Sequence, residues 1–459
     1  MKVTEELLKK YNVPVPRYTS YPPANHFTTA FGEEDFIGMV RGSNSRKPEN
    51  IAIYIHVPFC KRICHYCGCN SCQIGDGSQV EPYFGALERE IRLVARYIDK
   101  NREVSQVHFG GGTPNAVSFA FLGNIMSLLR SEFTFGVNPE IAIECDPASL
   151  DIHYVDNLLS AGFNRISFGI QDFNTEVLHL VNRRPPAVPP AELLRHIKAA
   201  APGTGVNFDF IYGLPGQSVE SFTRTMEMAA VMRPDRLVTF SYAHVPWARK
   251  NQVILEKRGL PAAEVKTDMF LSAHGVMTAA GYKPIGLDHF VLPTDDLYTA
   301  FTTGTLHRNF QGYCTRKTTG QVYAFGVTAI SQLADGYSQN IKDIDQYISL
   351  TSQGTLPVER GYILNPGQKL ASRVITDLMC NNRISFPETA AACGVDEAAL
   401  RSAVRIDEKA LADLQGDGLI DYTGDEIRVT GTGSFFIRNV AAALDPGYRE
   451  AVQTYSKPV

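Results

Sequence analysis

The sequence predicts an α/β fold, a partial (β/α)6 barrel of the TIM type, on the strength of three observations. Short runs rich in β-branched residues recur from residue 51 onward, and stretches with helical periodicity separate them. This switching between periods of 2 and 3.6 is the pattern of βα units with a parallel sheet. Six such units follow in order, and polar residues or glycines stand where the strands end. We therefore expect an open or partial barrel with its site at the carboxyl ends of the strands.

Each unit pairs a predicted strand with a predicted helix. The strands are expected at Ile51–Val57, Gln106–Phe109, Glu140–Glu144, Arg165–Ile170, Val206–Tyr212 and Leu237–Tyr242. The helices are expected at Tyr83–Tyr97, Phe119–Phe133, Ile152–Ala161, Glu192–Ala200 and Glu220–Met232, with a further one at 262–281. Because the carboxyl ends of parallel strands meet at one end of a barrel, the residues after each strand should converge there.

Three domains are expected. Residues 1–48 form an N-terminal arm, because Pro16–Pro23 is dense in prolines and aromatics, as an ordered extended segment is. Residues 49–364 form the barrel and its extension. Residues 365–459 follow a break at Asn365-Pro366-Gly367 and form a mostly helical, winged-helix-like domain with β-like pieces at Leu419–Tyr422 and Ile427–Thr430. That domain lacks a basic helix, so we interpret it as a structural lid and not as a DNA-binding module.

The composition limits the class of protein. Of 459 residues, 44% are hydrophobic and 20% charged, which is ordinary for a globular protein, and the net charge of −4 gives no reason to expect nucleic acid. No apolar run reaches membrane-spanning length, and the N-terminus has no signal-peptide core. Nine cysteines without an export signal indicate reduced thiols. A cytoplasmic location is therefore expected.

The most specific motif is a group of three cysteines after the first strand. Cys60, Cys64 and Cys67 stand at C-x3-C-x2-C spacing in a short loop. Since cubane 4Fe–4S clusters are normally held by four cysteines, three thiolates would leave one iron open for another ligand. Zinc and disulfides are alternatives, but zinc sites usually need a second cysteine pair. Cys69 and Cys72 follow closely, and either one as a fourth ligand would make the cluster a mere electron carrier.

Glycines and polar residues mark five successive strand ends. They are Gly110-Gly111-Gly112-Thr113-Pro114 after the second strand, Glu144 in the third, Gln171 after the fourth, Asp209 in the fifth, and Ser241-Tyr242-Ala243-His244 at the end of the sixth. Glycines let a backbone approach a ligand closely, although a tight turn alone also explains them. Five such ends in succession, facing one cysteine loop, favour a ligand site.

Three further segments have candidate roles. Arg183 follows the fourth strand by little more than one helix, where an arginine can bind a carboxylate with two parallel hydrogen bonds, although adjacent arginines are usually solvated surface. His307–Tyr313 is dense in polar and aromatic residues, as an ordinary loop also is. Residues 324–333 are small and apolar, which suits packing against a cofactor or plain core packing.

With these motifs in place, the sequence resembles the oxygen-independent coproporphyrinogen III oxidase (dehydrogenase) family of the radical-SAM enzymes. The resemblance covers nearly the whole chain. The cysteine spacing is shared with all radical-SAM enzymes, whereas the Pro16–Pro22 arm, Cys69 and His307–Tyr313 are much more specific. Other matching segments are Gly68-Cys69-Asn70, Gly110–Pro114, Gly169–Phe173, Tyr212–Pro215 and Asp288-His289-Phe290.

The resemblance implies a 4Fe–4S cluster on Cys60, Cys64 and Cys67, with Cys69 off the iron, and two molecules of S-adenosyl-L-methionine. By matching position, Tyr54, Glu144 and Ile330 would hold the molecule bound to the cluster. The residues expected around the second molecule are Tyr66, Gly111, Gly112, Thr113, Gln171, Arg183, Asp209 and Ala243. Those expected to act in catalysis are Tyr54, Glu144, Arg183 and Gln311.

The implied reaction converts two propionates of coproporphyrinogen III to vinyl groups and gives protoporphyrinogen IX in haem biosynthesis. It would use 5′-deoxyadenosyl radicals, with electrons from an unidentified donor such as flavodoxin or ferredoxin. We expect a monomer with no nucleic-acid or membrane partner. Two other classes stay open: a haem chaperone, which would lack the arm and Cys69, and a haem-degrading radical-SAM methyltransferase. An iron–sulfur electron carrier would instead have four ligands.

Overall fold

A curved sheet of 12 strands forms the centre of the computed structural model, which describes residues 3–316 and 318–448. The strand order is β16-β15-β14-β13-β1-β4-β5-β6-β7-β8-β10-β9. The predicted α/β fold is confirmed, because the six predicted strands are present and neighbouring members pair in parallel. They are β1 (Ile51–Val57), β4 (Glu103–Gly111), β5 (Thr134–Cys145), β6 (Arg165–Gln171), β7 (Gly205–Tyr212) and β8 (Arg236–Ser241). The outer ends of the predicted domains, at 1–2 and 449–459, lie outside the described residues.

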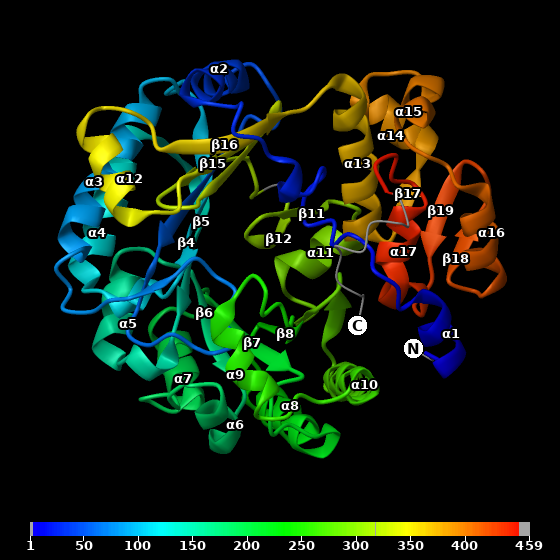
Figure 1. Cartoon of the computed structure of the whole chain (residues 1–459), viewed down its shortest axis with the longest axis horizontal. Helices are drawn as coiled ribbons and strands as arrows, with labels where there is room; N and C mark the ends of the chain where they lie inside the picture. The colour runs from blue at the N-terminus through cyan, green and yellow to red at the C-terminus, as the bar shows by residue number, and fades with distance from the viewer. Residues whose placement is uncertain (1–2, 317, 449–459) are drawn as a thin grey trace.

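Helices cover the outer side of the parallel strands, as Figure 1 shows along its left and lower edges. They are α3 (Val80–Ala95), α4 (Phe119–Glu132), α5 (Ile152–Ser160), α6 (Thr175–Leu180), α7 (Pro190–Ala200), α8 (Val219–Met232) and α10 (Ala263–Ala279). Side-chain caps fix where several begin: Ser118 caps α4, Asp151 caps α5 and Ser218 caps α8. All seven residues of β1 are buried or half-buried, as expected of a strand covered on both faces.

The sheet continues beyond the six predicted strands at both edges. On one side β13 pairs in parallel with β1, and antiparallel strands follow it. On the other side β10 pairs antiparallel with β8, and β9 pairs antiparallel with β10. The added strands are β13 (Gln321–Phe325), β14 (Ile330–Leu333), β15 (Gly336–Asn340), β16 (Val358–Ile363), β9 (Lys283–Ile285) and β10 (His289–Val291). Residues 324–333 therefore include the end of β13 and all of β14, with Ala324 and Phe325 buried.

The His307–Tyr313 segment differs from an ordinary loop. It forms most of an antiparallel hairpin between β11 (Leu306–Asn309) and β12 (Gly312–Thr315). The side chain of Asn309 accepts hydrogen bonds from the backbone N–H groups of Gln311 and Gly312, at 2.9 and 3.2 Å, and thereby closes the turn. Other elements that precede the C-terminal region are α9 (Val253–Glu256), α11 (Asp296–Thr302) and α12 (Ile344–Ser352), with short β2 (Phe59–Cys60) and β3 (Cys72–Gln73) beside the cysteines.

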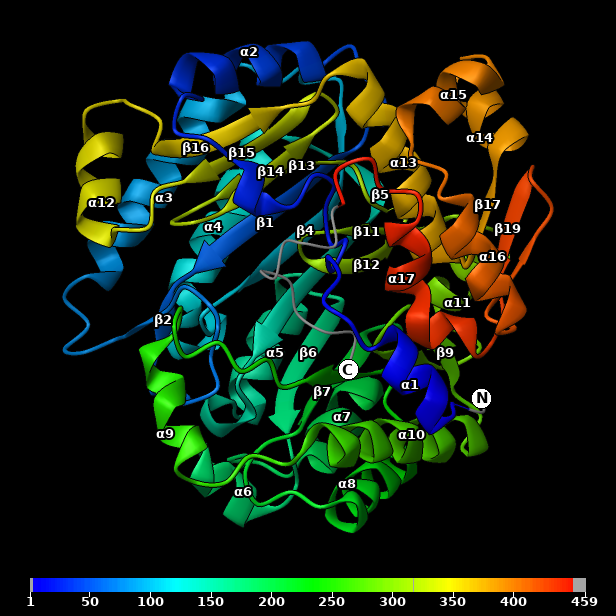
Figure 2. The ribbon, with the colours of Figure 1, turned by 45° about the vertical axis from the view of Figure 1, so that its right-hand side comes forward.

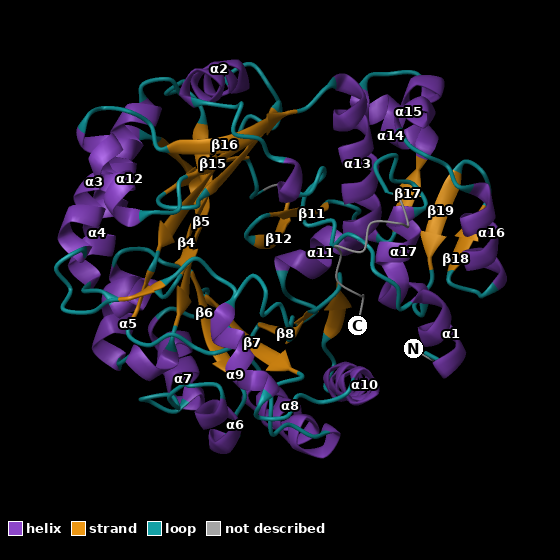
Figure 3. Ribbon diagram, in the orientation of Figure 1, coloured by secondary structure: helices purple, strands orange, loops and turns teal. Residues whose placement is uncertain are grey.

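The C-terminal region is mostly helical, with one small antiparallel sheet, as the purple and orange segments at the right of Figure 3 show. Asn365, at the predicted break, caps the long helix α13, and Pro366 occupies its first turn. The elements are α13 (Pro366–Asn381), β17 (Arg383–Ser385), α14 (Phe386–Cys393), α15 (Glu397–Ala403), α16 (Glu408–Gly416), β18 (Ile420–Tyr422), β19 (Glu426–Val429) and α17 (Ile437–Ala442).

The first residues of the chain pack in two places. Helix α1 (Glu5–Tyr11) and the segment after it lie against the C-terminal region, where Tyr11, Tyr18 and Tyr21 join its hydrophobic core (Figure 2). Helix α2 (Glu33–Ser43) instead packs into the core of the large sheet through Phe36 and its neighbours. The arm is thus anchored at both ends. Among the described residues, no helix has the length and apolar character needed to cross a membrane.

Candidate functional site

The three-cysteine loop leaves the carboxyl end of β1 and is held in place by hydrogen bonds to its backbone. The side-chain amide of Asn251 donates to the carbonyls of Cys64 and His65 at 3.1 and 3.0 Å. The amide of Gln252 donates to the carbonyl of Tyr66 at 2.9 Å. Because these two residues lie just before α9, the segment after β8 fixes the conformation of the loop.

The thiols of this loop influence one another without surrounding a single point. Burial raises the pKa of Cys60 to about 11, and Cys67 and Cys64 add to that rise. A hydrogen bond with Cys69 lowers the pKa of Cys67 to about 6. Among the described residues no three His, Cys, Asp or Glu side chains are arranged to hold one metal ion. That arrangement does not suit mononuclear zinc, whereas a cubane cluster takes one thiolate per iron.

Cys69 and Cys72 have different surroundings. Cys69 lies beside Cys67, and both that thiol and Glu144 contribute to the raised pKa of Cys69. Cys72 lies on β3 and packs against the hydrophobic core of the sheet, where burial alone raises its pKa. Of the two, Cys69 therefore lies among the thiols of the cysteine loop, and Cys72 does not.

Tyr54 and Glu144, both predicted site residues, meet through a histidine. The ring of Tyr54 stacks on that of His108, with centroids 5.8 Å apart, and His108 Nε2 donates to Glu144 Oε1 at 3.0 Å. Burial alone would raise the pKa of Glu144, but the contacts with His108 and with the Gly111 N–H lower it overall. The carboxylate thus stays ionised, 44% exposed, and ready to accept from a cationic or N–H-bearing ligand.

The glycine turn brings β4 against the beginning of the cysteine loop. The backbone N–H of Gly112 donates to the carbonyl of Val57 at 2.8 Å, and that of Thr113 donates to Phe59 at 2.9 Å. A Cβ atom at position 112 would lie 2.6 Å from the backbone oxygen of Pro58, so only glycine fits there. The hydroxyl of Thr113 lies 3.3 Å from Cys60 Sγ. The glycine turn therefore contacts the beginning of the cysteine loop directly.

Arg183 is engaged within the chain. Its Nη2 donates to Asp146 Oδ1 at 2.9 Å and to the carbonyl of Gly169, and its Nη1 donates to the Tyr66 hydroxyl at 3.1 Å and approaches Cys64 Sγ at 3.6 Å. Burial alone would lower the pKa of Arg183, but Tyr66, Asp146 and Cys64 raise it. The guanidinium thus remains cationic beside the cysteine loop.

Gln171 lies on β6 and Asp209 lies on the neighbouring strand β7. Gln171 adopts a left-handed backbone conformation, and its buried Oε1 has no hydrogen-bond partner. Burial raises the pKa of Asp209 to about 6, although its carboxylate accepts from Ser167 at 2.6 Å and from Asn207 at 2.7 Å. Because buried acceptors are nearly always hydrogen-bonded, the unpartnered oxygen of Gln171 indicates that a polar ligand donates to it near Asp209.

The remaining predicted residues lie at the edges of this region. Ala243 is exposed just after β8, and Ile330 begins β14. Ile330 packs, together with Phe310, against the cluster of Phe27, Tyr337 and Leu364. Gln311 follows Phe310 in the hairpin turn, so the hairpin brings Gln311 to the same neighbourhood as Ile330.

Sequence reasoning missed the groups that position the predicted ones: His56, His108, Asp146, Ser167 and Asn207. His56 Nδ1 lies 3.3 Å from the Tyr54 hydroxyl, and its Nε2 lies 2.9 Å from the carbonyl of Asn70 in the cysteine loop. A signal exists for two of these residues. His56 and Asn207 each lie in an otherwise apolar strand, two positions from Tyr54 and Asp209, and so on the same face of the strand.

Comparisons with known proteins decide the family. A model of the radical SAM superfamily matches residues 54–229. The oxygen-independent coproporphyrinogen III oxidase of Synechocystis is 37% identical over 97% of this chain and 95% of its own length. That of Escherichia coli is 38% identical over 99% of this chain and 98% of its own length. The chain belongs to the oxygen-independent coproporphyrinogen III oxidase family.

A solved structure supports the assignment to this family. The coproporphyrinogen III oxidase of Escherichia coli, described as a radical SAM enzyme, superposes on this chain with a TM-score of 0.89. The superposition covers 98% of this chain and 100% of the Escherichia coli chain. This chain is accordingly a radical-SAM enzyme, which implies a 4Fe–4S cluster and S-adenosylmethionine. The spaced thiols of Cys60, Cys64 and Cys67 suit the former, and the unpartnered Gln171 oxygen suits a polar cofactor such as the latter.

Proposed function

We propose that this chain oxidatively decarboxylates two propionates of coproporphyrinogen III to vinyl groups and so produces protoporphyrinogen IX. The observation that carries this proposal is the identity of 37–38% with family members over nearly the whole chain, arm and C-terminal region included. Anaerobic incubation of the cluster-loaded protein with S-adenosylmethionine, a reductant and coproporphyrinogen III tests it. The mass of the product should correspond to a divinyl tetrapyrrole, and unchanged substrate would contradict the proposal.

When bound, the cluster and S-adenosylmethionine supply a 5′-deoxyadenosyl radical that removes hydrogen from the β-carbon of a propionate. The residues of the chain hold and orient the reactants. Cys60, Cys64 and Cys67 would hold the cluster, and the glycine turn sets the position of their loop. Glu144, ionised and fixed by His108, would accept hydrogen bonds from the S-adenosylmethionine next to the cluster. Positioning of this kind supplies much of the rate in a reaction between held groups.

Two molecules of S-adenosylmethionine are proposed, one for each of two sets of residues. Tyr54 and Glu144 lie on β1 and β5, and Ile330 begins β14. The second set comes from the cysteine loop, from β4, β6, β7 and the segments after them, and from the segment after β8; its residues are Tyr66, Gly111, Gly112, Thr113, Gln171, Arg183, Asp209 and Ala243. Because Arg183 is already bonded to Asp146, Tyr66 and Gly169, we propose that it orients the second site through Tyr66 and Asp146. A direct contact between Arg183 and a carboxylate of the ligand stays a prediction.

The proposed electron donor is a small anionic protein, such as flavodoxin or ferredoxin. Trp247 is 81% exposed, and Val253 and Ile254 are each 40% exposed, on the segment whose neighbours hold the cysteine loop. Exposed cations lie in the same segment at Lys250, Lys257 and Arg258, and in the cysteine loop at Lys61 and Arg62, with Glu256 as an exposed acid in the segment. Exposed cations near apolar side chains favour rapid encounter with an anionic partner.

A charge reversal tests this docking surface. Lys250→Glu should slow reduction of the cluster by flavodoxin, followed by the loss of visible absorbance, and reduction by dithionite should be unchanged. Lys409→Glu, on α16 in the C-terminal region, is the matched control. Equal rates with flavodoxin in wild type and Lys250→Glu would place the donor elsewhere.

A further inference from the structure

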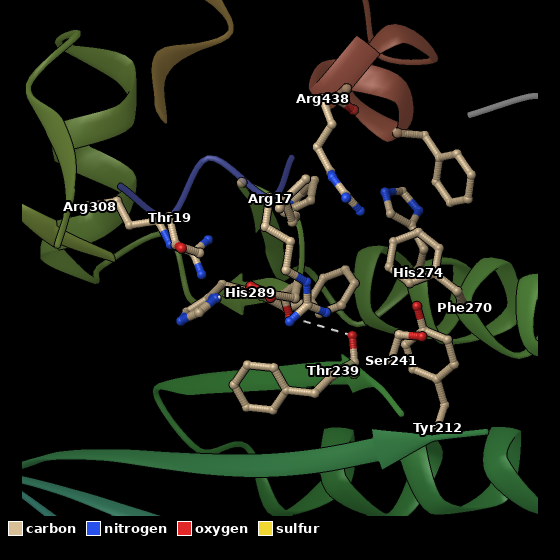
Figure 4. A pocket seen from close by; sticks show the side chains of 18 residues that line it. Arg17, Thr19, Tyr212, Thr239, Ser241, Phe270, His274, His289, Arg308 and Arg438 are labelled. Carbon is tan, nitrogen blue, oxygen red and sulfur yellow. Dashed lines mark hydrogen bonds and ion pairs between the residues drawn. The ribbon is translucent and has the colours of Figure 1, made fainter. Parts of the chain in front are cut away.

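A polar cavity of about 120 Å³ lies beside the carboxyl ends of β7 and β8. Three arginines from segments far apart in the chain line it: Arg17 of the arm, Arg308 on β11 and Arg438 on α17. Figure 4 shows their side chains entering the cavity from the blue arm, the green hairpin side and the red helix, above Tyr212 and Ser241. The cavity therefore forms only when the arm, the barrel and the C-terminal region are assembled.

This cavity adjoins the site described above. His289, which lines it, and Glu144, which lies beside the cysteine loop, both influence the pKa of Asp209. Tyr212 and Ser241 end β7 and β8, at the same edge of the parallel strands as Glu144 and Gln171. A ligand that occupies the site near Asp209 can therefore extend a substituent into this cavity.

The charge of the cavity is unbalanced. Three guanidinium groups face it, with His274 and His289, and Asp288 is the single carboxylate among its lining residues. Asp288 is itself paired with His289 at 2.6 Å. Burial, together with the charge of Arg17, lowers the pKa of Arg438 to about 10. Bringing like charges together in this way is unfavourable unless an anion joins them.

Arg308 has unused donors. Its Nε and Nη1 are buried and have no hydrogen-bond partner, and its guanidinium carbon lies 4.7 Å from the centre of the Tyr313 ring. Buried N–H groups are nearly always paired, so these two donors indicate an acceptor that binds there. Arg438 differs, because it donates to the backbone carbonyls of Val15 and Pro16 and so holds the arm beside the cavity.

We propose that this cavity binds the carboxylate of a propionate side chain of the tetrapyrrole substrate, with Arg308 and Arg17 as its donors. This inference rests on the proposed function, which supplies a substrate with four propionates. Arginine binds carboxylates with paired charge-assisted hydrogen bonds. A pocket for a whole drug-sized ligand has about 300–1,000 Å³. The cavity of about 120 Å³ is thus sized for one side chain, and the macrocycle lies outside it.

Arg438 is a positioning residue in this scheme. By binding Val15 and Pro16 it places Arg17, the next residue of the arm, over the cavity. Docking of the arm and capture of the carboxylate are therefore coupled. The cavity holds a propionate that is not reacting and so selects how the ring is oriented toward the cysteine loop.

Equilibrium titration with coproporphyrin III, the stable oxidised form with the same four propionates, tests the inference by porphyrin fluorescence. Arg308→Gln should weaken binding about 10- to 100-fold, as loss of hydrogen bonds to a charged group does. Arg308→Lys should be nearly as weak, because an ammonium does not reproduce the planar fork. Arg17→Gln should weaken binding as well. Arg224→Gln, exposed on α8, is the matched control and should bind like the wild type.

The tetramethyl ester of coproporphyrin III separates a specific loss from general damage. It has no carboxylates, so wild type and Arg308→Gln should bind it equally weakly. Equal binding of the free acid by wild type and Arg308→Gln would overturn the inference, as would an equal loss for acid and ester. The proposed function fails separately, if the wild type binds as expected but makes no vinyl product.

Discussion

The phenol of Tyr18 donates a 3.0 Å hydrogen bond to the carboxylate of Asp445, from the other end of the chain. Tyr21 donates to the other oxygen of that carboxylate at 2.8 Å. Burial and the charge of Asp445 raise the pKa of both phenols, so they remain donors. One buried carboxylate thus fastens the arm, and with it Arg17, to the C-terminal region.

Replacement of Asp445 by Ala should release the arm. Two buried phenols would lose their acceptor, which costs about 1–3 kcal/mol in the free energy of unfolding. Limited proteolysis should then cut near Tyr18, product formation should fall, and the cluster absorbance should remain. Asp413→Ala, exposed on α16, is the control. A protease-resistant arm in Asp445→Ala would show that other contacts hold it.

Cys60, Cys64 and Cys67 should be the only protein ligands of the cluster. Replacing any one of them by Ala should abolish the brown chromophore or leave a fragment of it, measured by absorbance and iron content after anaerobic reconstitution. Cys69→Ala should keep the chromophore, even though this thiol lies beside Cys67. Loss of iron in Cys69→Ala would demonstrate four-cysteine ligation and remove the open iron.

Arg183 should not tolerate lysine. Its two terminal nitrogens join Asp146, Gly169 and Tyr66, and an ammonium has no planar fork to do so. Loss of such buried charged contacts costs roughly 2–5 kcal/mol, so turnover should fall by about 30- to several-thousand-fold in both Arg183→Lys and Arg183→Ala. Arg184→Ala, at the exposed neighbour, should keep near-normal turnover. Unchanged turnover in both Arg183 variants would remove its role.

Glu90 should make stability depend on pH. Burial raises its pKa from 4.5 to about 7, although Tyr347, Gly326 and Asn340 all donate to it. Between those values the folded protein holds a proton that the unfolded chain has lost, so the free energy of unfolding should fall as pH rises, by about 3 kcal/mol in total.

Urea unfolding of the cluster-free protein at several pH values measures this dependence. Glu90→Gln cannot ionise and should lack that fall, whereas Glu81→Gln, exposed on the same helix, should behave as wild type. An identical pH dependence in wild type and Glu90→Gln would show that Glu90 is ionised throughout.

The sequence predicted the six parallel strands because their apolar runs and the helices between them are local patterns. It did not predict the added strands β13 to β16. The pairing of β13 with β1 joins Ile51 to Gln321, and the hydrophobic pattern within either strand does not indicate a partner so distant in the sequence. The hairpin at His307–Tyr313 was also missed, since its turn is closed by the side chain of Asn309 and lacks a tight two-residue glycine signal.

The candidate site shows the same division. Residues at strand ends, such as Glu144 and Asp209, follow from the geometry of parallel strands. The partners of Arg183 did not, because Asp146 and Tyr66 come from other units and meet it only in the folded chain. The family resemblance supplied the residues around S-adenosylmethionine, and their roles stay predictions.

The most direct test of the central claim counts products of a single anaerobic reaction with coproporphyrinogen III. The mass should fall in two equal steps, each by one CO2 and two hydrogens, through a one-vinyl intermediate. Each step should release one 5′-deoxyadenosine and one methionine. A product heavier by a methyl group with S-adenosylhomocysteine released, or tight haem binding with no 5′-deoxyadenosine, would contradict the account.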